Sequence, residues 1–422
     1  MIGDFHITGA QVLRPGGLSQ QPLGISDGRV VDNQPGRAVD LTGLWVLPGI
    51  VDIHGDGFER HLAPRRGAMT DLGAGLVGLE AELAANGITT AVLAQFWSWE
   101  GGMRGPDFAL KFLEALEGIA PTFATDLRAQ LRVETHLLDD FARIEAAVAR
   151  FGIGYVVFND HLPHDRLATG RKVPRLAGQA LKSGRSPEAH LALMQALRAR
   201  TGEVAGAVAA LADRLAAAGV RLGSHDDPDA AARANWRGRG CRIAEFPETA
   251  EAVAEAATGG DAVVMGAPNV VRGGSHTGKM AAIDAVRAGR CDALASDYHY
   301  PAPRSAALRL AGNFGIEAAW GLVSSGPARV LGLADRGTLA TGGRADLVVL
   351  DPATGRVGAT LAAGEMRYCA GTVAAAFLGG ASGPAAIQRR DDRLRSRGAR
   401  CRALTPCAPT KGSAPPVSIL RP

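Results

Sequence analysis

The sequence predicts a (β/α)8 barrel of the TIM type with a small β-sandwich built from its two flanks. Three observations lead to this fold class. From residue 46 onward, short apolar segments alternate with longer stretches of helical spacing. Both flanks of that region hold short alternating strands broken by Gly and Pro. The 422 residues are enough for one barrel of about 250 residues and a smaller unit.

The apolar segments read as eight strands that are buried on both faces, as strands of a parallel sheet are. They are Val46–His54, Ile88–Gln95, Leu131–His136, Gly154–Asn159, Val220–Ser224, Arg242–Phe246, Ala262–Ala267 and Ala293–Ser296. Helical spacing lies between them at Leu72–Ala85, Phe141–Arg150, Glu203–Ala218 and Thr249–Ala257. Strands and helices in this alternating order favour a closed barrel, and a doubly wound open sheet is the rival.

The flanks predict one small sandwich, because an isolated hairpin is only marginally stable. Residues 4–42 carry the turn pair Asp27-Gly28, and residues 335–380 repeat the pattern of short strands. We therefore expect residues 1–45 and 333–382 to form the sandwich and residues 46–332 to form the barrel. Residues 383–422 are rich in Arg, Pro and Ser without periodicity, which predicts a disordered basic tail.

Charge and composition exclude several classes of protein. The net charge of +4 comes from an arginine surplus in residues 389–402, and the remainder is close to neutral. A nucleic-acid partner is therefore not expected. Five Cys without a CxxC pair argue against a disulfide framework. With no signal peptide and no long apolar run, we expect a cytoplasmic protein that does not span a membrane. The sequence leaves open whether the chain forms a homo-oligomer.

Metal-ligand residue types stand where the predicted strands end, and active sites of these barrels are built at that end. The first strand ends in His54-Gly55-Asp56, and residues two apart on a strand point to the same face. Further His and acidic residues end later strands: Glu134, His136, Asn159-Asp160-His161, His225-Asp226-Asp227 and Asp297. A single His at a strand end is more often a hydrogen-bonded residue than a ligand. In a barrel, however, five strand ends that carry such residues would meet at one mouth, and this combination indicates a metal site. Imidazole with carboxylate suits Zn²⁺ or Mn²⁺.

Several segments resemble the amidohydrolase superfamily and, within it, the diphosphatases of the carbon–phosphorus lyase pathway. They are LPGIVDIHGDGFERHLAPRRG, FNDHLPH, GSHDD, EFPET, VMGAPNVVRGGSHTGK and SDYHYPAP, and the resemblance spans residues 1 to about 380. The superfamily usually has His-x-His on its first strand and a carboxylated Lys as bridging ligand. Here Asp56 stands at the second His, and Glu134 is the natural substitute for the Lys.

The resemblance implies a site with two divalent ions, Zn or Mn. His54 and Asp56 would hold one ion, Glu134 would bridge, and His161 and His225 would hold the second. Asp297 would contact the bridging water and act as the general base. The implied reaction is hydrolysis of α-D-ribose 1-methylphosphonate 5-triphosphate, a phosphorylated sugar, to the 5-phosphate and pyrophosphate.

The triphosphate requires cations and amide donors. The predicted substrate-binding residues lie in two loops and are Arg272, Gly273, Gly274, Ser275, His276 and Lys279, together with Glu59, Arg65 and Arg66. Glu245 and Glu248 in EFPET stay undecided between an extra ligand, a contact to a sugar hydroxyl and the start of a helix. The alternative function is that of another amidohydrolase, acting on an amide, an N-acyl amino acid or a dipeptide.

Overall fold

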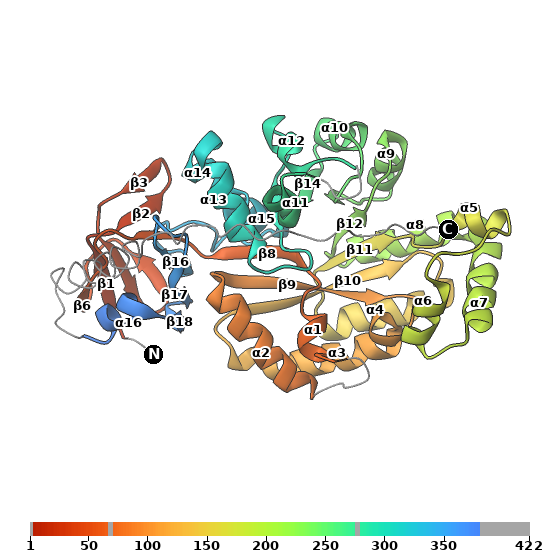
Figure 1. Cartoon of the computed structure of the whole chain (residues 1–422), viewed down its shortest axis with the longest axis horizontal. Helices are drawn as coiled ribbons and strands as arrows, with labels where there is room; N and C mark the ends of the chain where they lie inside the picture. The colour runs from red at the N-terminus through yellow and green to blue at the C-terminus, as the bar shows by residue number, and fades with distance from the viewer. Residues whose placement is uncertain (1–2, 66–70, 275–278, 380–422) are drawn as a thin grey trace, which may run out of the picture.

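The computed structural model describes residues 3–65, 71–274 and 279–379. At its centre, eight parallel strands follow one another around a barrel in the order of the sequence (Figure 1). They are β8 (Ile50–Gly55), β9 (Ile88–Trp97), β10 (Asp126–Glu134), β11 (Tyr155–Asn159), β12 (Arg221–His225), β13 (Ile243–Glu245), β14 (Ala262–Gly266) and β15 (Ala293–Ala295). A parallel bridge between Gly55 and Asp297 joins the last strand to the first. The barrel prediction is confirmed over the open sheet.

The first expected strand, Val46–His54, is in fact two strands. β7 (Trp45–Pro48) pairs with a strand of the other flank and belongs to the small β-domain, whereas β8 opens the barrel. The break falls at Gly49, where a Cβ atom would lie 2.2 Å from the Thr89 hydroxyl oxygen. The chain therefore passes from one domain to the other without a linker, which the continuous apolar sequence conceals.

Helices cover the outside of the barrel. They are α1 (Glu59–Leu62), α2 (Leu72–Ala85), α3 (Pro106–Ile119), α4 (Phe141–Phe151), α8 (Thr201–Ala217), α9 (Ala230–Gly238), α10 (Ala250–Thr258), α11 (Ala267–Arg272), α12 (Ala282–Arg287), α13 (Ala302–Phe314), α14 (Ile316–Gly321) and α15 (Ser325–Leu331). The four expected helices correspond to α2, α4, α8 and α10. The Thr249 hydroxyl accepts a hydrogen bond from the Ala252 amide and caps α10, so this residue starts the helix.

The small β-domain combines both flanks, as predicted. One sheet runs β5-β4-β1-β6 and the other runs β18-β17-β16-β7-β2-β3. The strands are β1 (Phe5–Thr8), β2 (Gln11–Arg14), β3 (Gly17–Ser19), β4 (Leu23–Ser26), β5 (Arg29–Val31), β6 (Arg37–Asp40), β16 (Leu347–Leu350), β17 (Val357–Ala362) and β18 (Glu365–Cys369), with α16 (Gly371–Phe377) after them. Phe5 and Val39 of one sheet share a buried core with Leu347 and Leu361 of the other.

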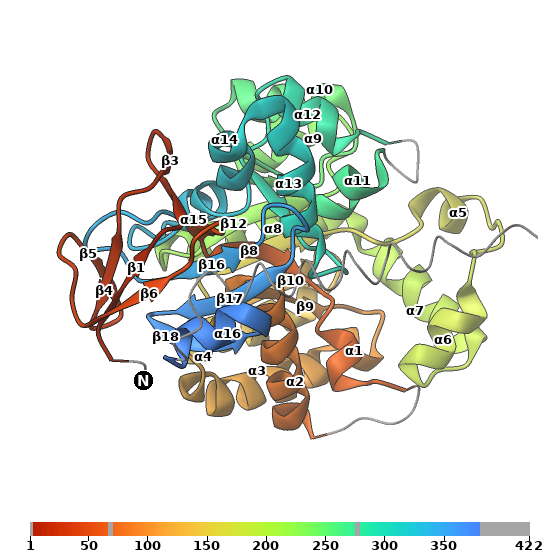
Figure 2. The ribbon, with the colours of Figure 1, turned by 60° about the vertical axis from the view of Figure 1, so that its left-hand side comes forward.

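A helical insertion follows β11 and comprises α5 (His164–Ala168), α6 (Leu176–Ser183) and α7 (Pro187–Ala199). It lies at the opposite end of the molecule from the β-domain, as Figures 1 and 2 both show. Its apolar side chains Val173, Met194 and Leu197 pack with Trp99, which follows β9. The insertion is thereby attached to the strand ends where the predicted site lies.

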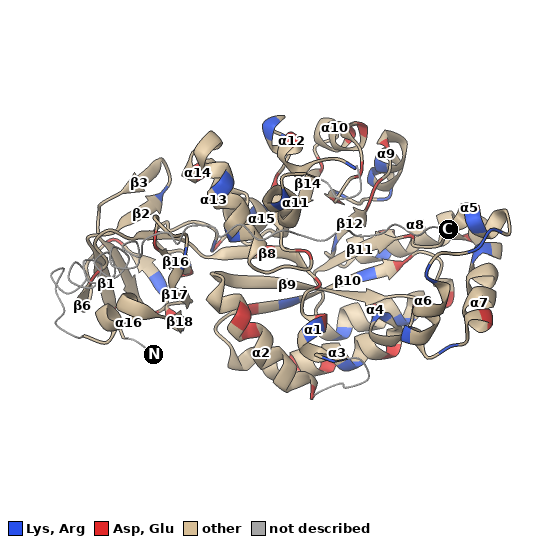
Figure 3. Cartoon of the chain, in the orientation of Figure 1, with Lys and Arg blue, Asp and Glu red and all other residues tan. Residues whose placement is uncertain are grey.

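Two further expectations concern the surface and the tail. Lys and Arg are interspersed with Asp and Glu over the described elements (Figure 3). Within the same residues, no helix combines the length and apolar character that crossing a bilayer requires. The basic tail predicted at residues 383–422 lies outside the described residues.

Candidate active site

The predicted ligand residues gather at the carboxyl ends of the barrel strands. Three residues within two positions of a strand end there adopt positive φ: Asp226 at 58°, Phe246 at 52° and Asp297 at 55°. Positive φ is unfavourable for side chains other than Gly, and for a bulky residue such as Phe it is a marked exception. Backbone strain is therefore concentrated around this end of the barrel.

The first group of ligand-type side chains consists of His54, His225 and Glu245, whose ligand atoms lie within 4.8 Å of one another. Oε2 of Glu245 lies 2.8 Å from Nδ1 of His54 and 3.2 Å from Nδ1 of His225. The two imidazole rings stack with centroids 5.4 Å apart. The structure therefore places His225 beside His54, and it adds Glu245, which sequence reasoning left undecided.

Glu245 is held in a fixed orientation by strands on the barrel interior. Its other oxygen, Oε1, accepts hydrogen bonds from the Tyr155 hydroxyl at 2.6 Å and the Gln130 amide at 2.7 Å. Burial opposes ionisation of this carboxyl, but the imidazoles of His54 and His225 outweigh it and lower the pKa of Glu245 below its usual range. Glu245 is therefore a buried carboxylate that faces two histidines.

The second group consists of Glu100, Glu134 and His161. Glu134 is fully buried at the end of β10, and its Oε1 lies 2.5 Å from Nδ1 of His161. Its Oε2 accepts from the His161 amide at 3.1 Å and from the Trp99 indole at 3.3 Å. The pKa of Glu134 is lowered, because contacts with His161 outweigh the effect of burial. The predicted neighbours Glu134 and His161 are thus brought together, and Glu100 joins them.

Arg132 lies between the two groups and was missed from the sequence. It precedes Glu134 by two residues on β10, so both side chains point into the barrel. Its guanidinium lies 2.8 Å from Nε2 of His225 and 4.0 Å from the Asp56 carboxylate, and it stacks over Phe96. Burial and this positive charge keep the pKa of His225 well below its usual range. The sequence could have indicated this position, because a residue two before Glu134 on the same strand faces the same side of the sheet.

Asp56 and Asp297 lie where the first and last strands meet. The Asp297 amide donates to the His54 carbonyl oxygen at 3.0 Å, and the Asp56 amide donates to the Asp297 carbonyl oxygen at 2.9 Å. Burial and the negative charge of Asp56 raise the pKa of Asp297 to about 6. A carboxyl with that pKa can accept a proton near neutral pH.

The donor set fits divalent cations. His54 is fully buried, yet neither of its ring nitrogens makes a hydrogen bond of acceptable geometry despite the short distance to Glu245. Leaving both nitrogens without a hydrogen bond is costly unless a cation uses one of them. Imidazole nitrogens and carboxylate oxygens are the ligands that Zn²⁺ and Mn²⁺ take in proteins. His54, His225 and Glu245 can hold one ion, and Glu134 and His161 can hold a second.

The predicted substrate-binding residues are less concentrated. Arg272 reaches the Tyr298 hydroxyl at 2.8 Å, and Lys279 forms an ion pair with Glu248. The amides of Gly273 and Gly274 donate to carbonyl oxygens of α11 and close that helix. These amides could donate to a phosphate only if they gave up their hydrogen bonds to the end of α11.

The remaining predicted residues divide between the first loop and the undescribed segments. Glu59 lies 3.7 Å from the Arg104 guanidinium, and Arg65 is exposed. Arg66, Ser275 and His276 lie outside the described residues.

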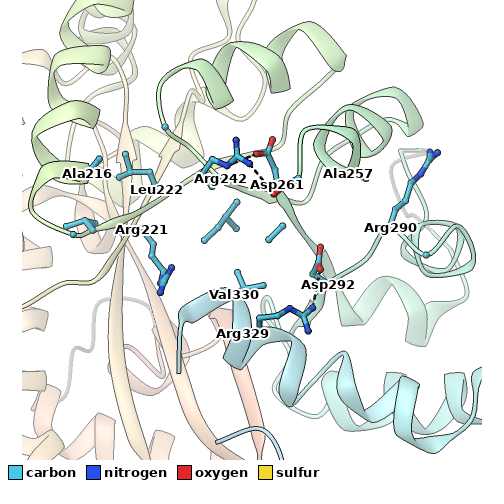
Figure 4. A pocket seen from close by; sticks show the side chains of 17 residues that line it. Ala216, Arg221, Leu222, Arg242, Ala257, Asp261, Arg290, Asp292, Arg329 and Val330 are labelled. Atoms are coloured by element: carbon cyan, nitrogen blue, oxygen red, sulfur yellow. Dashed lines mark hydrogen bonds and ion pairs between the residues drawn. The ribbon is translucent and has the colours of Figure 1, made fainter. Parts of the chain in front are cut away.

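A cavity of about 660 Å³ opens at the other end of the barrel, where the strands begin (Figure 4). Arg221, Arg242 and Arg329 line it together with Asp261 and Asp292. Arg242 is paired with Asp261 at 3.1 Å, and Arg329 is paired with Asp292 at 3.2 Å. This cavity contains none of the ligand-type histidines, so we place the candidate site at the carboxyl ends of the strands.

Comparison with solved structures supports the fold. The chain is similar to a β-aspartyl dipeptidase from Fervidobacterium islandicum AW-1, with a TM-score of 0.54 and 14% identity over 87% of this chain and 97% of that one. It is also similar to a mutant of an atrazine chlorohydrolase from Arthrobacter aurescens TC1, complexed with zinc and atraton, with a TM-score of 0.54 and 14% identity over 86% of this chain and 94% of that one.

A curated relative is closer in sequence. The chain is 33% identical over 324 residues to α-D-ribose 1-methylphosphonate 5-triphosphate diphosphatase of Escherichia coli (strain K12). The match covers 74% of this chain and 85% of that protein. No protein-family model matches the chain. Fold and sequence similarity agree, and the chain belongs to the α-D-ribose 1-methylphosphonate 5-triphosphate diphosphatase family of the amidohydrolase superfamily.

Proposed function

We propose that this hydrolase cleaves α-D-ribose 1-methylphosphonate 5-triphosphate to the 5-phosphate and pyrophosphate in a metal-dependent reaction. Water adds its oxygen to phosphorus, the P–O bond to the leaving pyrophosphate breaks, and the water proton passes to a base. The observation that carries the proposal is the pairing of two His–carboxylate groups at one barrel mouth in a chain of this family. The wider superfamily membership alone would leave the substrate open.

The proposed ion-binding residues come from the two groups of ligand-type side chains at the barrel mouth. His54, His225 and Glu245 would hold one divalent ion, while Glu134 and His161 would hold another. When bound, such ions lower the pKa of water and neutralise charge on phosphate oxygens. Asp56 lies next to the first group and remains a candidate ligand of that ion.

Asp297 is the proposed general base. Burial and the nearby Asp56 carboxylate give it a raised pKa of about 6, so near pH 7 it is mainly ionised and able to accept a proton. Its backbone is fixed by hydrogen bonds to the first barrel strand, which keeps the carboxylate near His54. Proton acceptance at this position requires no rearrangement of the strands.

Positive charge for the triphosphate would come from arginines around the mouth. Arg132 lies among the ligand residues, and although burial lowers its pKa from the ordinary arginine value, an arginine side chain keeps its charge in proteins. Arg272 and Lys279 lie after β14, where both now contact neighbouring side chains. We propose that substrate phosphates replace Glu248 as the partner of Lys279, since a polyphosphate carries more negative charge than one carboxylate.

The second candidate is hydrolysis of an amide. A structural neighbour is a prolidase complexed with N-methylphosphonate-L-proline, with a TM-score of 0.52 and 19% identity over 86% of this chain and 99% of that one. Together with the dipeptidase, it keeps an amide substrate open for this fold. The cations Arg132, Arg272 and Lys279 favour the triphosphate instead.

The test is ³¹P NMR of the triphosphate incubated with the zinc- or manganese-loaded protein. We expect signals of pyrophosphate and of the sugar 5-phosphate, their loss on chelation, and their return when the ion is restored. Release of single orthophosphate would assign a different regiochemistry. Turnover of a dipeptide or N-acyl amino acid without turnover of the triphosphate would replace the proposed substrate with the amide alternative.

A further inference from the structure

A third cluster of ligand-type side chains lies beside the proposed centre but shares no residue with it. It consists of His136, Asp160 and His164, whose ligand atoms lie within 4.8 Å of one another. Oδ1 of Asp160 lies 3.6 Å from Nδ1 of His136, and Oδ2 lies 2.8 Å from Nε2 of His164. The two imidazole ring centroids are 5.1 Å apart.

The hydrogen bonds around His136 determine which of its nitrogens can bind an ion. The Thr201 hydroxyl donates to the Arg198 carbonyl oxygen at 2.7 Å, so its oxygen is left to accept. Nε2 of His136 lies 3.2 Å from the Thr201 hydroxyl oxygen, so Nε2 is the nitrogen that carries the proton and donates it. Nδ1 carries the lone pair on the side of Asp160, within 3.2 Å of the Thr135 hydroxyl. Metal-binding histidines typically use one ring nitrogen to donate a hydrogen bond that orients the ring, and the other to bind the metal.

Asp160 is fixed in the same manner. Its Oδ1 accepts a hydrogen bond from the Leu162 amide at 3.1 Å, which holds the carboxylate toward His136. Around a tetrahedral zinc ion with ligand distances of about 2.0–2.1 Å, neighbouring ligand atoms lie about 3.3–3.4 Å apart. The 3.6 Å between Asp160 and His136 is close to that separation, whereas the 2.8 Å hydrogen bond between Asp160 and His164 would be replaced by bonds from both side chains to the ion.

The cluster is separate from the proposed catalytic groups. Asp160 precedes His161, but the two side chains have different partners: His161 contacts Glu134 and Glu100, whereas Asp160 contacts His164 and His136. His136 is buried, while the side chains of Asp160 and His164 are each 36% exposed. The cluster is therefore open to solvent on the side of Asp160 and His164.

We propose that His136, Asp160 and His164 bind a divalent transition-metal ion, of which zinc is the best match. His136 and Asp160 follow the barrel strands β10 and β11, whereas His164 is the first residue of α5. The ion fastens the start of the helical insertion to the barrel. Three protein ligands leave one coordination position for water. The site goes beyond the proposed hydrolysis and does not depend on it.

The test counts zinc ions per chain in wild type, His164→Asn and His6→Asn. His164 is half-exposed at the start of a short helix, so its substitution does not threaten the core. His6 lies in the small β-domain, where it contacts the Pro35 carbonyl oxygen, and it provides the matched control. Each full-length protein is stripped with chelator, loaded with zinc, dialysed against zinc-free buffer and analysed by mass spectrometry for zinc.

We expect His164→Asn to retain one zinc per chain fewer than wild type, and His6→Asn to retain the wild-type number. Hydrogen exchange provides a second readout, in which zinc slows exchange in residues 164–168 of wild type and not of His164→Asn. An unchanged zinc count in His164→Asn would overturn the proposal, as would an equal loss in His6→Asn. Because neither readout uses turnover, a failure of the proposed hydrolysis would leave this result interpretable.

Discussion

Replacing Glu245 with Gln removes one negative charge between His54 and His225 while preserving the shape of the side chain. The Tyr155 hydroxyl and the Gln130 amide both donate to Oε1, so the oxygen of the new amide remains on that side. Its nitrogen then takes the position of Oε2, which lies 2.8 Å from His54 and 3.2 Å from His225. A carboxylate that can contact a cation is thus replaced by a group that cannot.

The hydrogen bond between His225 and the Glu245 carboxylate is the interaction from which the size of the effect is taken. A hydrogen bond to a charged group contributes about 1.5–3 kcal/mol. At about 1.4 kcal/mol for each factor of ten, the loss corresponds to about 10- to 100-fold weaker ion binding at this group. If Glu245 is a direct ligand, the loss lies at the upper end of that range. The fold is expected to tolerate the change because Tyr155 and Gln130 keep their acceptor.

The assay is competition for zinc between the protein and a fluorescent chelator of known affinity. Glu248→Gln is the matched control, because it removes the same charge three residues away, where the carboxylate pairs with Lys279 instead of the histidines. We expect the control to bind zinc like wild type. Zinc affinity in Glu245→Gln within about threefold of wild type would show that Glu245 does not contribute to ion binding.

Three further predictions concern Asp297 and Asp52. Asp297→Asn should lower kcat by about 10²–10⁴-fold in steady-state assays with zinc content unchanged, since it removes the proposed general base. In the wild type, kcat/KM should fall as pH decreases below about 6, where the Asp297 carboxyl becomes protonated. A bound ion would move this fall to lower pH. A profile that stays flat down to about pH 4 would contradict the role of Asp297 as general base. Burial raises the pKa of Asp52 to about 6 despite its bonds to Ser296, so folding favours its protonated form. The stability that Asp52 contributes below pH about 4 is therefore lost as pH rises through 6. Asn does not titrate, so the free energy of unfolding of Asp52→Asn should increase by about 3 kcal/mol relative to that of wild type when the pH is raised from about 3 to about 7.5. Urea unfolding of the metal-free protein at the two pH values measures this difference.

The barrel could be predicted because its strands are short apolar segments between long helical patterns. The expected strand Ile88–Gln95 begins where β9 begins, and α2 matches its expected bounds. The division at Gly49 could not be predicted, since β7 and β8 are both apolar and adjacent. Pairing assigns β7 to the small domain, with β2 on one side and, on the other, β16, which lies about 300 residues away in the sequence.

The meeting of candidate residues at the strand ends could be predicted, but the way in which they are grouped could not. Residues at strand ends were expected to meet, and Glu134 and His161 do lie together. Which histidines share a carboxylate depends on the order of strands around the barrel and on side-chain direction. Glu245 contacts His225 because β13 pairs with β12, and it reaches His54 across the barrel interior. The segment EFPET, which contains Glu245, also fits the start of a helix, so the sequence alone did not indicate that Glu245 contacts both histidines.

The most direct test of the proposed hydrolysis compares two substrates with one zinc-loaded preparation: the ribose 5-triphosphate and a dipeptide, each followed to product. We expect pyrophosphate to be released from the triphosphate at least about 100-fold faster than the dipeptide is cleaved, and this release to be lost with chelator. Faster cleavage of the dipeptide, or pyrophosphate release that survives removal of the metal, would rule out the proposed reaction.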